Sequence, residues 1–417
     1  MKALRPSLVR FKFALVRARE EGMGWTFRQL LRRSGTAAAS VALLPLTIAL
    51  LVAGYRRLPV ITTRIGHLAA EVDCFLKEVE LGRLPRRRWF IVASPDKIAN
   101  PTLLHYWNGR VPVVRAPAMA AVLDLCTRHW ATLPRLREYV LALNGPARYF
   151  EVNTAWGARA PTISLTPEHE VRGRKVLLEL GLPPGAWFVC IHAREPGYAA
   201  HDDAIHAYRN SRIDDLLPAV HAIGRHGGWS IRVGDPTGQR LAGIDRCIDY
   251  AHHRLRSDWM DIFLGASCRF FLGNTSGLFV VSTIFGVPCA LANMTPVASL
   301  GFRIGDLAIP KMLWSTQERR LLTFDEAFNS PAAGYRMSRQ FAAAGLEVRD
   351  NTAEEILELT EEMIARLESK AAGYETYDVL QRRFAALIRP EHYCWGASSR
   401  VGSLFLAKYE HLLPAAA

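Results

Sequence analysis

The sequence lacks the short motifs that mark several large classes of enzyme. It contains neither G-x-G-x-x-G nor G-x-x-x-x-G-K-[ST], which argues against a dinucleotide-dependent dehydrogenase and a P-loop enzyme. The G-x-S-x-G motif of serine hydrolases is also absent, since residue 275 at the centre of the nearest match is Thr. No two Asp residues are spaced two apart, so the Asp-x-Asp arrangement that clamps a metal ion is missing.

Cysteine is scarce and unpatterned. None of the seven cysteines lies three residues from another, so there is no C-x-x-C zinc or redox motif. An odd number of cysteines without a disulfide framework favours a reducing compartment. The chain also has no internal repeat and no low-complexity segment.

Positive charge is concentrated at the N-terminus. The formal net charge of the chain is +13, but residues 1–60 contain eleven Lys and Arg against Glu20 and Glu21, and so account for +9. The remaining 357 residues are nearly balanced. A basic segment beside an apolar one indicates anionic lipid, whereas a basic surface throughout would indicate nucleic acid. We therefore expect a membrane partner and no nucleic acid.

The apolar segment is residues 34–55, which carry no charge and are flanked by paired arginines. Its 22 residues reach the length of about 20 that a membrane span needs. Residues 4–18 before it place apolar side chains on one helical face among Lys and Arg, which is typical of a helix on a membrane surface. Pro45 could kink the segment into a re-entrant hairpin, and a buried core helix behind a disordered basic tail is the alternative.

Apolar strands alternate with helices beyond residue 58, which predicts an α/β fold with parallel sheets and helices on both faces. In the first half we expect strands at 59–63, 89–93, 111–114 and 162–165, with a helix over 65–79. In the second half we expect strands at 187–191, 229–234, 247–251, 269–273 and 288–292. Ser211 and Ser257 are the expected N-caps of the helices between them, and Thr352 that of a strong helix through Leu367.

Polar residues follow each strand of the second half. His192 and Arg194 follow the first strand, Gly234 and Asp235 the second, and the run 274–277 the fourth. The carboxyl ends of parallel strands share one edge of a sheet, where such folds bind ligands. We therefore expect these residues to lie together. A surface loop with a salt-bridged arginine is the alternative for Arg194, and a buried, hydrogen-bonded core histidine is the alternative for His192.

The run Gly273-Asn274-Thr275-Ser276-Gly277 has the composition of an anion-binding loop. Its glycines allow the backbone to approach a ligand closely, and the free N–H groups of the helix that follows favour negative charge. Arg194 facing this loop would hold a diphosphate from two sides. An ordinary helix N-cap is the alternative. His201, Asp202, Asp203 and His206 lack a metal-binding motif, and we interpret them as loop residues.

Several motifs in order resemble a group of bacterial glycosyltransferases of the GT-B architecture. They are His192-Ala-Arg194-Glu-Pro-Gly-Tyr198, Tyr208-Arg209-Asn210, Arg232-Val-Gly234-Asp235-Pro236, Arg256-Ser-Asp258-Trp259-Met-Asp261 and Phe271-Leu-Gly-Asn-Thr-Ser-Gly277. The His-x-Arg is distantly similar to that of GDP-fucose-dependent fucosyltransferases, where the arginine meets the β-phosphate. Glu195-Pro196 departs from that family, and the 273–277 run is similar to heptosyltransferases, whose donor is an ADP-sugar, so the base stays open.

The resemblance implies two Rossmann-like domains that face a cleft. We expect a membrane-associated helical segment at 1–57, an acceptor domain at 58–172, a nucleotide-sugar domain at 173–325 and a helical extension at 326–417. The expected activity is a metal-independent hexosyl or deoxyhexosyl transfer, with no cofactor, from a nucleoside-diphosphate donor to a glycan or lipid-linked acceptor of cell-surface polysaccharide synthesis. A sugar-nucleotide epimerase and a non-catalytic membrane-attached assembly protein are the alternatives.

The expected site residues follow from these motifs. Arg194, Asn274, Thr275, Ser276 and Gly277 would bind the donor diphosphate. The nucleotide and sugar would contact His192, Tyr198, Arg209, Asn210, Gly234 and Asp235. His67 is the candidate general base, since imidazole titrates near neutral pH, and a packing role at a helix start is its alternative. Because nucleotide sugars are made in the cytosol, we expect a cytoplasmic membrane protein whose body faces the cytoplasm.

Overall fold

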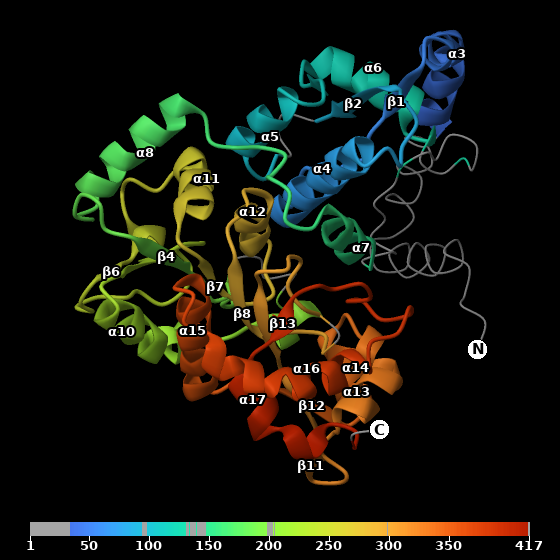
Figure 1. Cartoon of the computed structure of the whole chain (residues 1–417). Helices are drawn as coiled ribbons and strands as arrows, with labels where there is room; N and C mark the ends of the chain where they lie inside the picture. The colour runs from blue at the N-terminus through green and yellow to red at the C-terminus, as the bar shows by residue number, and fades with distance from the viewer. Residues whose placement is uncertain are drawn as a thin grey trace. The chain divides into compact units, whose positions relative to one another are not determined.

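The computed structural model describes residues 34–93, 98–130, 133, 139, 147–197, 203, 205–297 and 299–415. The chain forms two compact units (Figure 1). Unit 1 comprises residues 1–59, 86–96 and 111–140, and unit 2 comprises residues 60–85, 97–110 and 141–417. Both units contain a parallel sheet, which confirms the predicted α/β class. Tyr198 and the helix predicted around residues 4–18 lie outside the described residues.

Unit 1 is built on three parallel strands in the order β1-β2-β3. They are β1 (Tyr55–Arg57), β2 (Arg88–Val92) and β3 (Val113–Val114), and the helices are α3 (Leu44–Val52) and α6 (Pro117–Thr127). The strand predicted at 59–63 is wrong, because the strand that pairs with β2 begins four residues earlier and covers 55–57. Pro59 has no N–H for a ladder, and the Ile61 N–H donates to Glu71 Oε2 at 2.8 Å.

The apolar segment is helical but broken. Within the described part of the chain, no single helix has the length and hydropathy needed to cross a membrane. Ser34–Ala42 and Leu44–Val52 reach them only as a pair, bent by 53°. Pro45 lies in the first turn of α3, as its missing N–H permits.

Unit 2 contains a seven-stranded, fully parallel sheet in the order β13-β9-β8-β7-β4-β5-β6. The strands are β4 (Phe188–Ile191), β5 (Trp229–Arg232), β6 (Cys247–Ile248), β7 (Phe271–Gly273), β8 (Cys289–Met294), β9 (Leu307–Pro310) and β13 (Arg400–Val401). The chain enters the sheet at β4, runs outward to β6, and returns to β7 on the other side. The strand order therefore reverses between β4 and β7.

Helices cover both faces of this sheet (Figure 1). On one face lie α10 (Leu217–Arg225) and α15 (Ala353–Leu367), and Thr352 caps α15 as predicted, in a capping box with Glu355. On the other face lie α11 (Asp258–Ser267) and α12 (Leu278–Ile284). The helix α4 (Ile65–Glu80) packs against α12 and against α5 (Pro101–Asn108) and α7 (Ala147–Trp156), while α8 (Pro167–Glu179) packs against α11.

Two further predictions fail locally. Residues 162–165 form no strand, because Thr162 is held by side chains: its Oγ1 donates to Asp73 Oδ1 and its carbonyl accepts from Arg110. Ser211 caps no helix, because a 3-10 turn over Ile213–Leu216 precedes α10 and the Ser211 hydroxyl accepts from Asn274 Nδ2 at 2.8 Å. Ser257 does occupy the N-cap position of α11, but its side chain makes no capping bond.

The C-terminal segment 326–417, predicted to be helical, also supplies strands. An antiparallel sheet has the order β11-β10-β12, formed by β10 (Met312–Ser315), β11 (Arg320–Leu321) and β12 (Leu346–Arg349). The helices of this part of the chain are α13 (Phe324–Asn329), α14 (Ser338–Ala343), α16 (Asp378–Ala385) and α17 (Ser403–Lys408), and α14 packs against β12. Because β13 joins the large sheet, this segment is part of the core of unit 2.

Candidate functional site

The point where the strand order reverses brings the two principal sequence motifs together. Arg194 follows β4 and the 274–277 run follows β7, and β4 and β7 are neighbours, with Cys190 opposite Phe271. Open parallel sheets bind ligands at such a point, outside the carboxyl ends of the strands. We refer to these residues, with the adjoining segment 208–211, as the β4–β7 edge.

Asn274 ties the loops of this edge together. Its Oδ1 accepts from the Arg194 N–H at 3.1 Å, and its Nδ2 donates to the Arg209 carbonyl at 3.2 Å and to Ser211 Oγ at 2.8 Å. The side chain is almost completely buried. Asn274 therefore ties its own loop to the Arg194 loop and to the segment 208–211, and both of its amide protons are already in use.

Arg194 is a largely buried cation, and its ion-pair partner among the described residues is a distant carboxylate. Its Nη2 lies 3.9 Å from Asp203 Oδ1, while the other oxygen of Asp203 accepts from the Gly197 N–H at 2.6 Å. The Arg194 side chain is only 17% exposed. It is thus no ordinary surface arginine, since the one ion pair that it forms with a described residue is at the outer limit of the distance at which such pairs form.

Arg209 brings a second guanidinium group to the same edge. Its Nη2 donates to the Thr275 carbonyl at 2.9 Å, but its Nε is buried and has no partner among the described residues. Burial and then the nearby positive charge of Arg194 lower the pKa of Arg209, and Arg64 contributes in the same direction. The edge therefore contains clustered guanidinium groups, an arrangement that an anion would stabilise.

Thr275 and Ser276 differ in their hydrogen bonding. Thr275 Oγ1 accepts from the Thr295 N–H at 3.0 Å and lies 3.4 Å from Met294 Sδ, so it anchors the loop to the end of β8. Ser276 Oγ is buried without a partner in the described part of the chain. An unpaired buried hydroxyl costs on the order of 1–3 kcal/mol, and a ligand that bonds to it would offset that cost.

His192 and Gly234 pack on each other beside this edge. His192 Nδ1 lies 3.1 Å from the Val233 carbonyl and must carry the proton that this bond needs. Burial lowers the pKa of His192 to about 4, so the ring is neutral at physiological pH. A Cβ on Gly234 would lie 2.8 Å from His192 Nδ1, so the glycine makes room for the ring. This geometry is that of the core histidine given above as the alternative.

The other predicted nucleotide-binding residues lie in nearby loops. The Asn210 carbonyl accepts from Lys311 Nζ at 2.5 Å, while Asn210 Oδ1 is buried and has no partner among the described residues. Asp235 Oδ1 accepts from the Thr237 N–H at 3.0 Å in a local turn. Asn210 thus resembles Ser276 and Arg209 in leaving a polar atom unused.

The start of α4, which carries His67, meets the β4–β7 edge at the residue before His67. A Cβ on Gly66 would lie 2.9 Å from the Gly277 Cα, so the backbones of α4 and of the loop after β7 are in direct contact. His67 is the next residue after Gly66. Two segments separated by some 200 residues of sequence therefore meet within unit 2.

Glu71, one helical turn after His67, orients the imidazole. His67 Nδ1 lies 2.9 Å from Glu71 Oε1, and the buried carboxylate also accepts from the Ile61 N–H. A proton on Nδ1 leaves Nε2 as a proton acceptor on a side chain that is 28% exposed. Sequence reasoning missed Glu71, although its i,i+4 spacing from His67 in a predicted helix would have indicated the pair.

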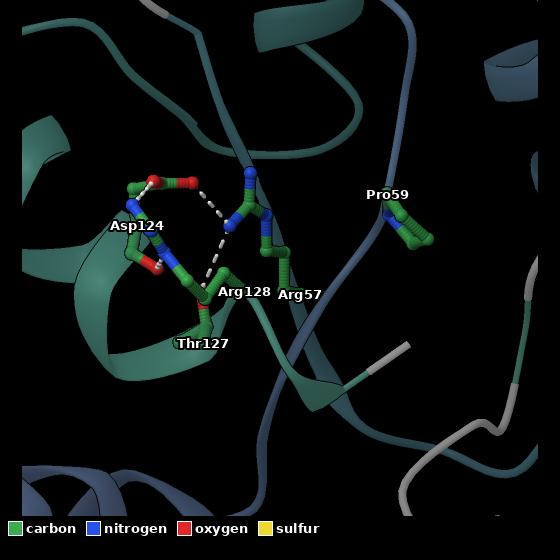
Figure 2. Close-up of a pocket in the computed structure, with 5 residues that line it drawn as sticks. All are labelled: Arg57, Pro59, Asp124, Thr127 and Arg128. Carbon is green, nitrogen blue, oxygen red and sulfur yellow. Dashed lines mark hydrogen bonds and ion pairs between the residues drawn. The ribbon is translucent and has the colours of Figure 1, made fainter. Parts of the chain in front are cut away.

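A separate pocket lies in unit 1 and contains none of the predicted site residues (Figure 2). It has a volume of about 140 Å³ and is lined by Arg57, Pro59, Asp124, Thr127 and Arg128. Arg57 Nη1 and Arg128 Nη2 contact the two oxygens of Asp124 at 2.8 and 2.5 Å. Although burial opposes it, these two guanidinium groups lower the pKa of Asp124. The charged side chains that line this pocket are thus paired with one another. We assign the pocket no catalytic role.

No group of three His, Cys, Asp or Glu side chains in the described ranges is arranged to hold a metal ion. Asp203 and His206 belong to those ranges, and each is engaged locally: Asp203 with Gly197 and Arg194, and His206 Nδ1 with the Arg336 carbonyl at 3.1 Å. His201 and Asp202 lie outside the described residues.

Comparisons with known proteins found distant structural likenesses. No family model and no curated protein matches the chain. A glycosyl transferase family 9 structure from Veillonella parvula DSM 2008 has a TM-score of 0.34 and 12% identity, covering 73% of this chain and 80% of that one. The E. coli ADP-heptose LPS heptosyltransferase II has a TM-score of 0.32 and 13% identity, covering 57% and 83%. Because both TM-scores are low, neither likeness assigns a function to this chain.

Proposed function

We propose that the chain is a glycosyltransferase that binds the diphosphate of a nucleotide sugar at the β4–β7 edge. The observation that carries the proposal is the pair of largely buried guanidinium groups, Arg194 and Arg209, at the reversal of strand order, beside the Ser276 hydroxyl, which has no partner among the described residues. Two planar guanidinium groups with little neighbouring negative charge bind the oxygens of a phosphate more favourably than they bind a neutral ligand. Asn210 Oδ1, which no described residue contacts by a hydrogen bond, supplies an acceptor for a nucleoside or sugar hydroxyl.

The chemistry follows from where charge develops. As the bond from the sugar to the diphosphate breaks, negative charge grows on the leaving group. Donors already aimed at that position stabilise the transition state, at about 3 kcal/mol for one donor. Arg194 and Arg209 supply fixed positive charge and the Ser276 hydroxyl a further donor, so the proposal requires no metal ion and no cofactor.

His67 is the proposed general base for the acceptor hydroxyl. Glu71 holds the proton on Nδ1, which leaves Nε2 to take the proton as the acceptor oxygen attacks the sugar. A base that acts in this way belongs to an inverting transfer, in which the acceptor replaces the diphosphate directly. The contact between Gly66 and Gly277 brings the start of the helix that carries this base to the β4–β7 edge.

The finer assignments rest on the sequence. We propose a GT-B architecture, transfer of a hexose or deoxyhexose, and a glycan or lipid-linked acceptor of cell-surface polysaccharide synthesis. His192-Ala-Arg194 is similar to fucosyltransferases, and residues 273–277 are similar to heptosyltransferases. GDP and ADP are therefore the donor nucleotides to compare with UDP. A bacterial cytoplasmic membrane, with the body of the protein in the cytoplasm, fits the cytosolic source of nucleotide sugars.

A thermal-shift screen with UDP, GDP, ADP and CMP tests the proposal and identifies the base. A nucleotide at 100 times its Kd stabilises a protein by about 2.7 kcal/mol, so one of the four should raise the Tm clearly. Arg194→Ala should abolish that rise. Arg174→Ala, which removes an arginine that is 75% exposed on α8, should retain it.

The alternatives give other outcomes. A wild-type chain that responds to none of the four nucleotides contradicts the proposal and favours a non-catalytic assembly protein. A chain that binds a nucleotide and converts the donor sugar with no acceptor present favours an epimerase.

A further inference from the structure

The net positive charge of the chain belongs entirely to unit 1. The residues of this unit include 18 Lys and Arg against five Asp and Glu, a formal charge of +13 that equals the value for the whole chain. Unit 2 is therefore formally neutral. Such a separation of charge within one chain gives unit 1 an attraction for anionic surfaces that unit 2 lacks.

Unit 1 also exposes an apolar stripe. Val41, Leu44, Ile48 and Val52 recur at helical spacing along the bent helix pair, and they are 70%, 51%, 52% and 84% exposed. No residue of α3 is buried. Large apolar side chains gathered on one exposed face mark an interaction surface.

Other side chains of the helix pair attach it to the folded unit. Ser40 Oγ donates to the Leu125 carbonyl at 3.2 Å and Thr47 Oγ1 lies 3.4 Å from the Cys126 carbonyl, so both halves of the pair are anchored at the end of α6. The N-terminal half of α6 adds exposed Met119, and Val122 follows one turn later. The pair is therefore a part of unit 1 and no free-standing span.

The dimensions favour a surface position over a crossing. Each half of the pair has nine residues and is about 14 Å long, against a hydrocarbon core of about 30 Å, and the two halves are bent by 53°. Exposed arginines lie beside the C-terminal end of α3: the Arg88 N–H donates to the Gly54 carbonyl at 3.0 Å, and Arg86 and Arg87 precede it. Apolar side chains flanked by arginines fit the boundary between acyl chains and phosphate headgroups.

We propose that unit 1 docks on one leaflet of an anionic lipid bilayer, inserting the stripe of α3 with the exposed side chains of α6 while Arg86–Arg88 meet the headgroup phosphates. The combination of positive charge and an apolar stripe favours a lipid bilayer over other partners. Nucleic acid would use the charge but not the apolar stripe, and a protein interface would use the stripe without an excess of 13 positive charges. The docking does not depend on the proposed glycosyl transfer.

Flotation of the purified full-length chain with preformed vesicles tests this. We expect binding to phosphatidylcholine vesicles that contain phosphatidylglycerol, little binding to phosphatidylcholine alone, and release as the salt concentration rises. Ile48→Glu with Val52→Glu should weaken binding by about tenfold or more, because two apolar side chains can no longer be buried. Val171→Glu with Leu178→Glu, at exposed positions of α8 in unit 2, should bind as the wild type does.

Two further variants complete the test. Met119→Glu places a charge at the exposed apolar position of α6. This variant serves as the test if the α3 variant does not fold. Arg86→Gln with Arg87→Gln should weaken binding about fivefold for each arginine removed. Equal flotation with neutral and anionic vesicles, wild-type binding by a folded stripe variant, or association only after reconstitution from detergent would overturn the proposal. None of these results depends on nucleotide binding, so its failure is distinguishable from that of the proposed activity.

Discussion

The polar side chains of the β4–β7 edge fall into two kinds by their hydrogen bonds. Asn274 uses its carbonyl oxygen and both amide protons to hold three loops, and Thr275 anchors its loop to the residues after β8. Ser276 and Arg209, in contrast, leave buried polar atoms without a partner among the described residues. The first kind shapes the site, and the second kind is available to a ligand.

Substitutions of Asn274 and Ser276 should separate these roles. Asn274→Ala removes one partner from three buried groups and should lower the free energy of unfolding by about 2–4 kcal/mol. Ser276→Ala removes a hydroxyl that has no partner in the described part of the chain, so it should leave the stability of the free protein within about 0.5 kcal/mol and reduce the nucleotide-induced thermal shift. Denaturant unfolding with and without nucleotide measures both effects. Equal destabilisation by the two variants would contradict this division.

The neutral state of His192 makes a specific contribution to the pH dependence of stability. Burial lowers the pKa of His192 from 6.5 to about 4, so below pH 6.5 the unfolded chain takes up a proton that the folded chain resists. Stability from this residue is complete above pH 6.5 and is lost as the pH falls to about 4, by roughly 3 kcal/mol in all. His192→Asn should remove that part of the pH dependence.

The measurement for His192 is the difference in unfolding free energy between the wild type and His192→Asn across pH 4–7. A difference is needed because Asp306, whose pKa burial raises to about 6, acts in the opposite direction: its contribution is complete below pH 3.8 and is lost as the pH rises through 6. Parallel pH curves for the two proteins would show that His192 is not held neutral by the fold.

At the scale of the elements, segments that carry an apolar pattern of their own were predictable, and segments without such a pattern were not. The strands β4, β5, β7 and β8 and the helix α15 form close to their predicted positions, because each carries an apolar pattern of its own. The two-residue strand β13 has no pattern, and only its pairing with β9 makes it a strand. Ser211 illustrates the same limit at a cap, since its hydroxyl bonds to Asn274, 63 residues away, instead of to the helix that follows.

The contact between α4 and the loop after β7 can be tested by adding one methyl group at Gly277. Gly277 has an ordinary helical φ of −81°, so Gly277→Ala is unstrained in itself, but its Cβ would lie 2.9 Å from the Gly66 nitrogen. The variant should push α4 away and destabilise the protein by about 1–3 kcal/mol. Gly373→Ala, which would meet nothing within 4 Å, is the control. Equal melting temperatures for the two variants would show that the backbones at Gly66 and Gly277 are not in close contact.

At the scale of the whole molecule, the chain separates its charge from its candidate chemistry. The excess of positive charge lies in unit 1, while the β4–β7 edge and His67 lie in the formally neutral unit 2. The sequence showed the excess at residues 1–60, but Arg86–Arg88 and α6 join the same unit only through the pairing of β1, β2 and β3 and the packing of α3. Such pairing is a property of the folded chain, and no local pattern could have indicated it.

Unit 2 likewise assembles its candidate site from residues around 65, 194, 209 and 276, and a mutant cycle on His67 and Glu71 tests that assembly. His67→Ala should lower kcat by about 100-fold or more if His67 is the general base, and Glu71→Gln should lower it less. The double variant should be no slower than His67→Ala, because Glu71 acts only through the imidazole.

Steady-state kinetics with saturating donor measures the cycle. The nucleotide-induced thermal shift should stay unchanged in all three variants, and it controls for the integrity of the β4–β7 edge. Losses that simply multiply in the double variant would mean that Glu71 supports the fold around Ile61 and does not position the base.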